Sequence, residues 1–185
     1  DPKNYDRLIE IYEALADYGY REVGQEYLQN VLNTDKKLDA YDSGRIYYYL
    51  GDYQKAYLAL EEAKGKGGVD SYLYLGKAYA ATGDYNYASS VYSNYLSKQG
   101  PDAEIYNQLG LCELAKKDYQ KALEAFQAGK QIEGNSLMQT LSFNEIVAYE
   151  YLQDYQKAAV LLKAYLQNYP DDQAAIREQQ FLSTR

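Results

Sequence analysis

The residues of this chain that could carry out catalysis are carboxylates and one thiol, because the 185-residue sequence contains no histidine. This absence removes His-assisted serine or cysteine nucleophiles, histidine general bases and imidazole metal ligands. Paired carboxylates occur at Glu61-Glu62 and Asp171-Asp172. Adjacent residues on a helix do not face each other, so these pairs indicate solvated surface and a helix cap. A carboxylate-only enzyme stays an open alternative.

The single cysteine, Cys112, lies beside Leu111 and Leu114 in a stretch with helical spacing of apolar residues. This setting is typical of a small packed core residue rather than a nucleophile. One cysteine also excludes an intrachain disulfide and fits any compartment. We therefore expect no enzymatic activity, no metal and no cofactor.

Tyrosine is the unusual residue type in this composition, with 25 Tyr against 3 Phe and no Trp. One interpretation is that Tyr fills large core sites with its hydroxyl at the edge. The other is a Tyr-lined binding surface, since Tyr combines an apolar face with a polar group and is enriched at interfaces. The composition alone leaves both open.

The elements that position these side chains follow from an internal repeat. The dipeptide Asp-Tyr occurs at Asp52-Tyr53, Asp84-Tyr85, Asp118-Tyr119 and Asp154-Tyr155, with intervals of 32, 34 and 36 residues. Each Asp is followed four residues later by Ala and preceded eight residues earlier by Gly44, Gly76, Gly110 or Ile146. Eight residues after the Asp stand Leu60, Tyr92, Phe126 and Leu162. A fixed period of this length predicts a helical solenoid.

Each repeated residue has a physical reason within a pair of helices. The Asp is expected to cap the second helix, where its side chain can accept a bond from a backbone N–H of the first turn. Gly51 and Gly83 precede the Asp and suit a left-handed residue at the end of the first helix. The small Gly and Ala positions allow close approach to the large apolar residue of the partner helix.

This pattern resembles the tetratricopeptide repeat: a small residue at the eighth position, Gly-Asp-Tyr at the turn, Ala at the twentieth and a large apolar residue at the twenty-fourth. The resemblance implies an all-α fold, a right-handed superhelical solenoid of antiparallel helix pairs. We expect one domain over 1–185, with a degenerate repeat at 4–36, repeats at 37–68, 69–102, 103–138 and 139–170, and a C-terminal capping helix at 171–183. The family's first-helix Trp is missing, and Tyr72 and Tyr106 take its place in two units.

In this family the first helices of successive repeats line a concave groove. Carrying those positions over predicts a partner-binding surface of Tyr41, Arg45, Tyr48, Leu73, Lys77, Asn107, Leu111, Phe143, Val147 and Tyr151. Such a surface suits an extended peptide or an amphipathic helix. The scattered Arg45, Lys77 and Asn107 do not match the set with which some members clamp a C-terminal carboxylate. Taken singly, Arg45 and Lys77 could equally be solvated helix surface.

The net charge of −8, without a basic stripe, argues against nucleic acid and against an anionic membrane surface. No apolar run approaches the ~20 residues of a membrane-spanning helix. The chain opens at Asp1 rather than Met, which leaves open its compartment and whether a segment upstream has been removed.

The leading hypothesis is a non-catalytic interaction scaffold that binds a protein or peptide partner in a Tyr-rich groove. Two alternatives stay open: self-association of a structural module through its end repeats, and a glycan-binding role for the Tyr faces.

Overall fold

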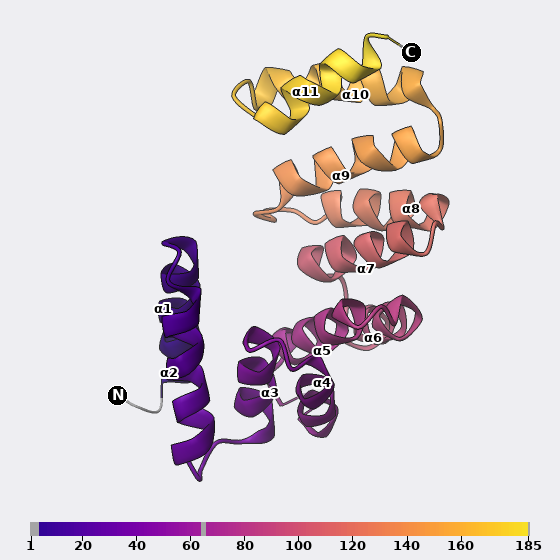
Figure 1. The fold of residues 1–185 in the computed structure, drawn as a ribbon. Helices are drawn as coiled ribbons and strands as arrows, with labels where there is room; N and C mark the ends of the chain where they lie inside the picture. Colours follow the sequence, from indigo (N-terminus) through magenta and orange to yellow (C-terminus); the bar gives the residue numbers. More distant parts are fainter. Residues whose placement is uncertain (1–3, 64–65, 185) are drawn as a thin grey trace. The chain divides into compact units, whose positions relative to one another are not determined.

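The computed structural model describes residues 4–63 and 66–184 and contains eleven helices and no strand in those ranges. The helices are α1 (Tyr5–Asp17), α2 (Arg21–Thr34), α3 (Ala40–Tyr49), α4 (Tyr53–Glu62), α5 (Val69–Ala81), α6 (Tyr85–Gln99), α7 (Ala103–Ala115), α8 (Tyr119–Lys130), α9 (Met138–Tyr151), α10 (Tyr155–Asn168) and α11 (Gln173–Leu182) (Figure 1). Consecutive helices pack against each other within a unit, as in α3 with α4 and α7 with α8. The predicted all-α solenoid of helix pairs is confirmed.

Two compact units make up the chain, Asp1–Asp84 and Tyr85–Arg185. Unit 1 carries α1 to α5 and unit 2 carries α6 to α11. The boundary falls inside the repeat expected at 69–102. The single domain over 1–185 and the right-handed sense of the superhelix stay predictions.

The repeated Asp residues start the second helices, as expected. Asp52, Asp118 and Asp154 are the N-caps of α4, α8 and α10, and each accepts a bond from the backbone N–H three residues on. The N···O distances are 3.2 Å to Lys55, 3.4 Å to Lys121 and 3.0 Å to Lys157. Asp84 directly precedes α6.

The turn before each Asp requires a left-handed backbone. Gly51 and Gly83 have φ of 79° and 84°, which confirms the expectation for these glycines. In the two later repeats Lys117 and Gln153 take the same conformation, with φ of 64° and 61°. A side chain there is uncommon, because left-handed backbone costs a non-glycine residue roughly 1–2 kcal/mol.

Small residues set the spacing between paired helices. A Cβ added to Gly44 would lie 2.6 Å from Cγ of Leu60, and one added to Gly110 would overlap the ring of Phe126. Leu60 and Phe126 are fully buried. The predicted packing of a small site against a large one is therefore present in both units.

The last helix, α11, begins after Asp172, whose carboxylate accepts bonds from the N–H groups of Ala174 and Ala175 at 3.0 and 3.1 Å. Ala175 and Leu182 are buried in the core of unit 2 with Leu162. Phe181 of the same helix is 41% exposed. No described helix combines the length and hydropathy needed to cross a membrane.

Candidate functional site

The predicted contact residues lie on the first helices of their pairs. In unit 1 they are Tyr41, Arg45 and Tyr48 on α3, and Leu73 and Lys77 on α5. In unit 2 they are Asn107 and Leu111 on α7, and Phe143, Val147 and Tyr151 on α9. Helices α3 and α5 contact each other, so the five residues of unit 1 lie on neighbouring elements.

Burial divides this set. Leu111 and Tyr151 are exposed, whereas most of the others are half-buried. Arg45 and Asn107 are each only 5% exposed. Neither side chain therefore lies at the open groove position that the sequence led us to expect. The alternative of solvated helix surface does not describe Arg45 either. Both make polar contacts inside their own unit that a helical pattern cannot show.

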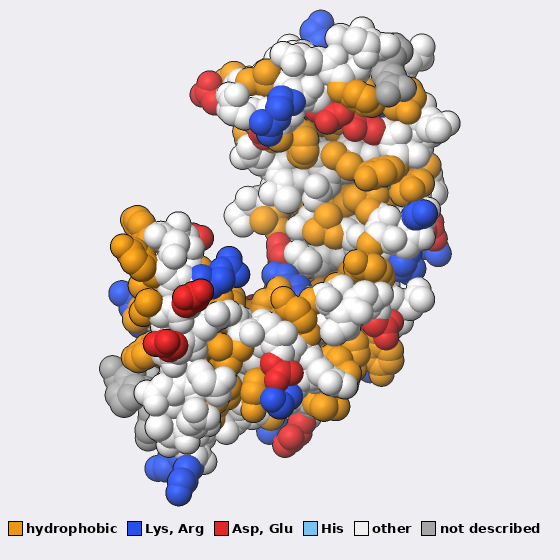
Figure 2. All heavy atoms as spheres, in the orientation of Figure 1, with side chains coloured by type: hydrophobic (Ala, Val, Ile, Leu, Met, Phe, Trp, Pro, Cys, Tyr) orange, Lys and Arg blue, Asp and Glu red, His pale blue; other side chains and the backbone are white. Residues whose placement is uncertain are grey.

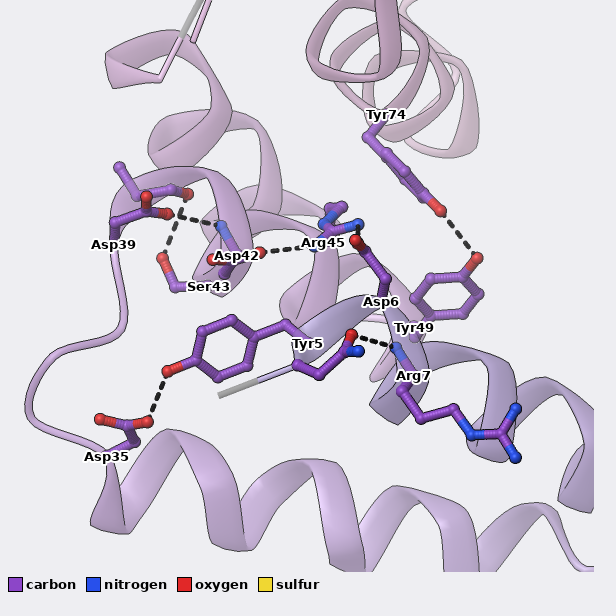
Figure 3. Close-up of polar contacts among 12 residues, drawn as sticks. Tyr5, Asp6, Arg7, Asp35, Asp39, Asp42, Ser43, Arg45, Tyr49 and Tyr74 are labelled. Atoms are coloured by element: carbon purple, nitrogen blue, oxygen red, sulfur yellow. Dashed lines mark hydrogen bonds and ion pairs between the residues drawn. The ribbon is translucent and has the colours of Figure 1, made fainter. Parts of the chain in front are cut away.

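Arg45 is held by two carboxylates, those of Asp6 and Asp42 (Figure 3), and it lies over an aromatic ring. Its guanidinium donates to Asp6 of α1 at 2.6 Å and to Asp42 of α3 at 2.5 Å, and it lies 4.3 Å from the ring centroid of Tyr41. Burial opposes the charged form of Arg45, yet the bonds to Asp6 and Asp42 raise the pKa of the guanidinium further. Arg45 thus links α1 to α3 as a permanent cation.

A cluster of tyrosines lies beside Arg45 on α3 and α5. The ring of Tyr48 meets those of Tyr49, Tyr53 and Tyr74 at centroid distances of 5.5, 5.6 and 5.6 Å. Burial raises the pKa of Tyr48 and of Tyr74, so both hydroxyls stay protonated at neutral pH. We call the surface formed by Tyr48, Tyr49 and Tyr74 the unit 1 tyrosine face.

Tyr74 was missed by the sequence analysis, which followed only the family's groove positions. It is linked to Tyr49 by a hydroxyl–hydroxyl bond of 2.9 Å (Figure 3). Tyr49 donates to Glu13 of α1 at 2.6 Å. The sequence contains a signal, because Tyr72 and Tyr74 are two residues apart and therefore lie on different faces of a helix. In the structure Tyr72 is buried and Tyr74 is half-buried.

The contact residues of unit 2 are also engaged with their neighbours. Asn107 accepts a hydrogen bond from Asn144 at 2.9 Å. Phe143 packs against Tyr165 of the core at 5.7 Å between ring centroids. Tyr151 stacks on Tyr119 at 4.9 Å with 13° between the ring planes, and its other face is available because the residue is 55% exposed.

A polar cleft of about 820 Å³ opens elsewhere in unit 1, between α2 and the α3–α4 turn. Its lining residues include Gln25, Gln29, Asn30 and Asn33 of α2, with Tyr47, Asp52 and Lys55 opposite. The repeat pattern in the sequence gives no indication of this cleft. It is a second concave surface on which a ligand could be tested.

The side chains considered for catalysis in the sequence have structural roles in the fold. Cys112 is 4% exposed, and burial raises the pKa of its thiol to about 12, so the nucleophilic thiolate is scarce at neutral pH. Asp172 caps α11. No group of three or more potential Cys, Asp or Glu ligands for a metal ion is found among residues 4–63 and 66–184.

Comparison with known proteins agrees with this geometry. Residues 73–136 and 143–172 each match a tetratricopeptide repeat family, and together these segments span about half of the chain. The chain belongs to the tetratricopeptide repeat family. Comparison with curated proteins gave no match.

Solved structures share the fold at low sequence identity. A tetratricopeptide repeat protein of Thermus thermophilus has a TM-score of 0.73 at 15% identity, with 98% of this chain and 100% of that chain covered. MamA of Desulfovibrio magneticus RS-1 has a TM-score of 0.65 at 19% identity, covering 92% and 98%. The second such domain of human RPAP3, solved with the HSP70 peptide SGPTIEEVD, has a TM-score of 0.53 at 16% identity, covering 60% and 90%.

Proposed function

We propose that this chain is a non-catalytic interaction scaffold that binds a peptide or helical segment on the first-helix faces of its repeats. The observation that carries the proposal is the aromatic surface there: Tyr48 and Tyr74 are only half-buried on α3 and α5, and Tyr151 is 55% exposed on α9. Rigid aromatic side chains give a large contact area at little entropic cost, so they are favoured anchors for a partner.

The family supports this assignment at the level of class. Tetratricopeptide repeats are interaction scaffolds, and the RPAP3 domain was solved with a peptide. The contact set remains the one expected from the sequence, with two changes. Arg45 and Asn107 act through neighbouring side chains, since both are buried, and Tyr74 joins the set.

A selection from a random peptide display library tests the proposal. The wild-type chain is expected to enrich specific peptides, and Tyr151→Ala, which removes an exposed ring, is expected to weaken their binding by roughly tenfold or more, as for an aromatic anchor. Glu62→Ala, an exposed change on α4, is the control and should leave binding unchanged. Circular dichroism of each variant verifies the fold. Absence of any enriched peptide would contradict the proposal.

A second candidate, self-association, is favoured by one specific surface. Ile11, Val23 and Tyr27 on the outer side of the α1–α2 pair are 39%, 55% and 49% exposed and line one shallow depression. Figure 2 shows hydrophobic side chains gathered along this edge. Such a patch marks interaction sites. In sedimentation experiments, self-association would make the apparent mass rise with protein concentration. Tyr27→Lys should return the apparent mass to that of the monomer, and this pair of results would support the candidate.

A further inference from the structure

The unit 1 tyrosine face presents hydrogen-bond acceptors. Tyr49 has one hydroxyl proton, and it is donated to the carboxylate of Glu13 at 2.6 Å. The 2.9 Å contact between the two hydroxyls must then use the proton of Tyr74, with Tyr49 as acceptor. The half-buried Tyr74 then has no hydroxyl proton left to donate, and its oxygen can only accept a further bond. A ligand meeting Glu13 and Tyr74 is therefore required to donate.

The charge of the face is negative despite Arg45. The Arg45 residue is 5% exposed, and its guanidinium already pairs with Asp6 and Asp42, so these three groups together bear one net negative charge. The side chain of Asp6 is 76% exposed, so part of that charge reaches solvent. Lys77 of α5 is likewise engaged within the chain.

Two further carboxylates border the rings. Glu13 of α1 and Asp70 of α5 are exposed, and both interact electrostatically with the Tyr74 hydroxyl. Asp70 and Asp6 also act on Tyr41, whose pKa is raised to about 12, chiefly by burial. Carboxylates from α1 and α5 thus border one aromatic cluster.

Tyrosine rings add attraction for a cation. A Lys or Arg side chain over a ring face is held by the ring quadrupole, and this chain already uses the interaction where Arg45 lies over Tyr41. Lys and Arg side chains carry hydrogen-bond donors and no acceptor, which matches the acceptor oxygens of Glu13, Asp70 and Tyr74. Hydrogen bonding, charge and ring electrostatics all select the same side chains.

We propose that the unit 1 tyrosine face binds a basic polypeptide segment, with Lys or Arg side chains between Glu13, Asp70 and Tyr74. This inference rests on the proposed scaffold function and names the chemistry of the partner. It contrasts with the acidic peptide SGPTIEEVD found on the RPAP3 domain. A carboxylate at this face would meet Asp6, Glu13 and Asp70, and would have to displace Asp6 to reach Arg45.

The peptide selection described above also tests this inference, because the composition of the enriched peptides is a separate readout from their existence. We expect an excess of Lys and Arg in the enriched peptides that bind the unit 1 tyrosine face. The double variant Glu13→Gln and Asp70→Asn keeps the size of both exposed side chains. This double variant should lower the affinity for a selected basic peptide by about two- to fivefold for each charge removed, as for exposed ion pairs.

The matched control is Glu22→Gln with Glu62→Gln, which removes the same charge from exposed sites on α2 and α4. It should leave affinity unchanged at low salt, and added salt should weaken the wild type more than the Glu13/Asp70 variant. Enriched peptides that are neutral or acidic would overturn the basic partner and leave the scaffold function standing. Equal losses in both double variants would reduce the effect to net charge and overturn the assigned face. No enrichment at all would overturn both proposals.

Discussion

Single carboxylates have distinct tasks in this chain. Some, such as Asp118, end in a helix cap, and others, such as Glu13, face solvent beside a ring. Sequence position alone separated the first class, because a cap is a local contact three residues long. It did not find the second, which depends on a helix more than thirty residues away.

The capping role predicts how Asp118 tolerates substitution. Asp118→Ala should lower the free energy of unfolding by about 1 kcal/mol, whereas Asp118→Ser should keep most of it, because Ser also caps well. The exposed ion pair with Lys121 at 2.7 Å adds little. Urea unfolding followed by circular dichroism measures both variants. Equal losses for Ala and Ser would count against the cap.

Glu150 predicts a pH dependence within unit 2. Burial, then the charge and hydrogen bond of Glu178 on α11, raise its pKa from an ordinary 4.5 to about 7. Since the folded value is the higher one, the stabilising contribution of the protonated group is complete below about pH 4.5. It is lost as pH rises through about 7.

Replacing Glu150 with Gln tests that sign. Glu150→Gln should be more stable than the wild type by about 1–2 kcal/mol near pH 8, with the difference shrinking toward pH 5. The exposed Glu133→Gln should differ little from the wild type at either pH. Urea unfolding at both pH values supplies the comparison. A Glu150→Gln advantage that is the same at both would show that charge is not its cause.

At the scale of elements, helix pairs depend on glycine sites that admit a large partner. Gly110→Ala should destabilise unit 2 by roughly 1–3 kcal/mol, because the added methyl meets the fully buried ring of Phe126. Gln120→Ala, on the exposed side of α8, should change stability by no more than about 0.5 kcal/mol. Thermal unfolding of both variants tests the packing, and a neutral Gly110→Ala would mean that the α7–α8 pair is spaced differently.

Most of the fold could be predicted from the sequence, and much less of the site. The Asp-Tyr period placed the turns correctly because caps and left-handed glycines are local. The burial of Arg45 could not be predicted from α3, since it depends on Asp6, 39 residues earlier. The turns at Lys117 and Gln153 show the same limit, because packed flanking helices hold a conformation that neither residue prefers.

For the whole molecule, a repeat scaffold keeps its rigid core separate from its contact surface. The buried residues of the helix pairs hold the first helices, and the aromatic faces of α3, α5 and α9 are the surfaces that we propose for recognition. Substitutions on those faces should therefore alter binding with little effect on the core. On this proposal, the choice of partner depends on a few side chains that differ from repeat to repeat.

Photo-crosslinking tests this account most directly. A display-selected peptide carrying a benzophenone side chain is bound to the wild-type chain, irradiated, and its attachment sites are mapped by mass spectrometry. The account predicts crosslinks on the first helices, with α3 and α5 near Tyr48 and Tyr74 the sites for basic peptides. Attachment confined to the polar cleft between α2 and the α3–α4 turn, to the outer side of the α1–α2 pair or to α11 would contradict it.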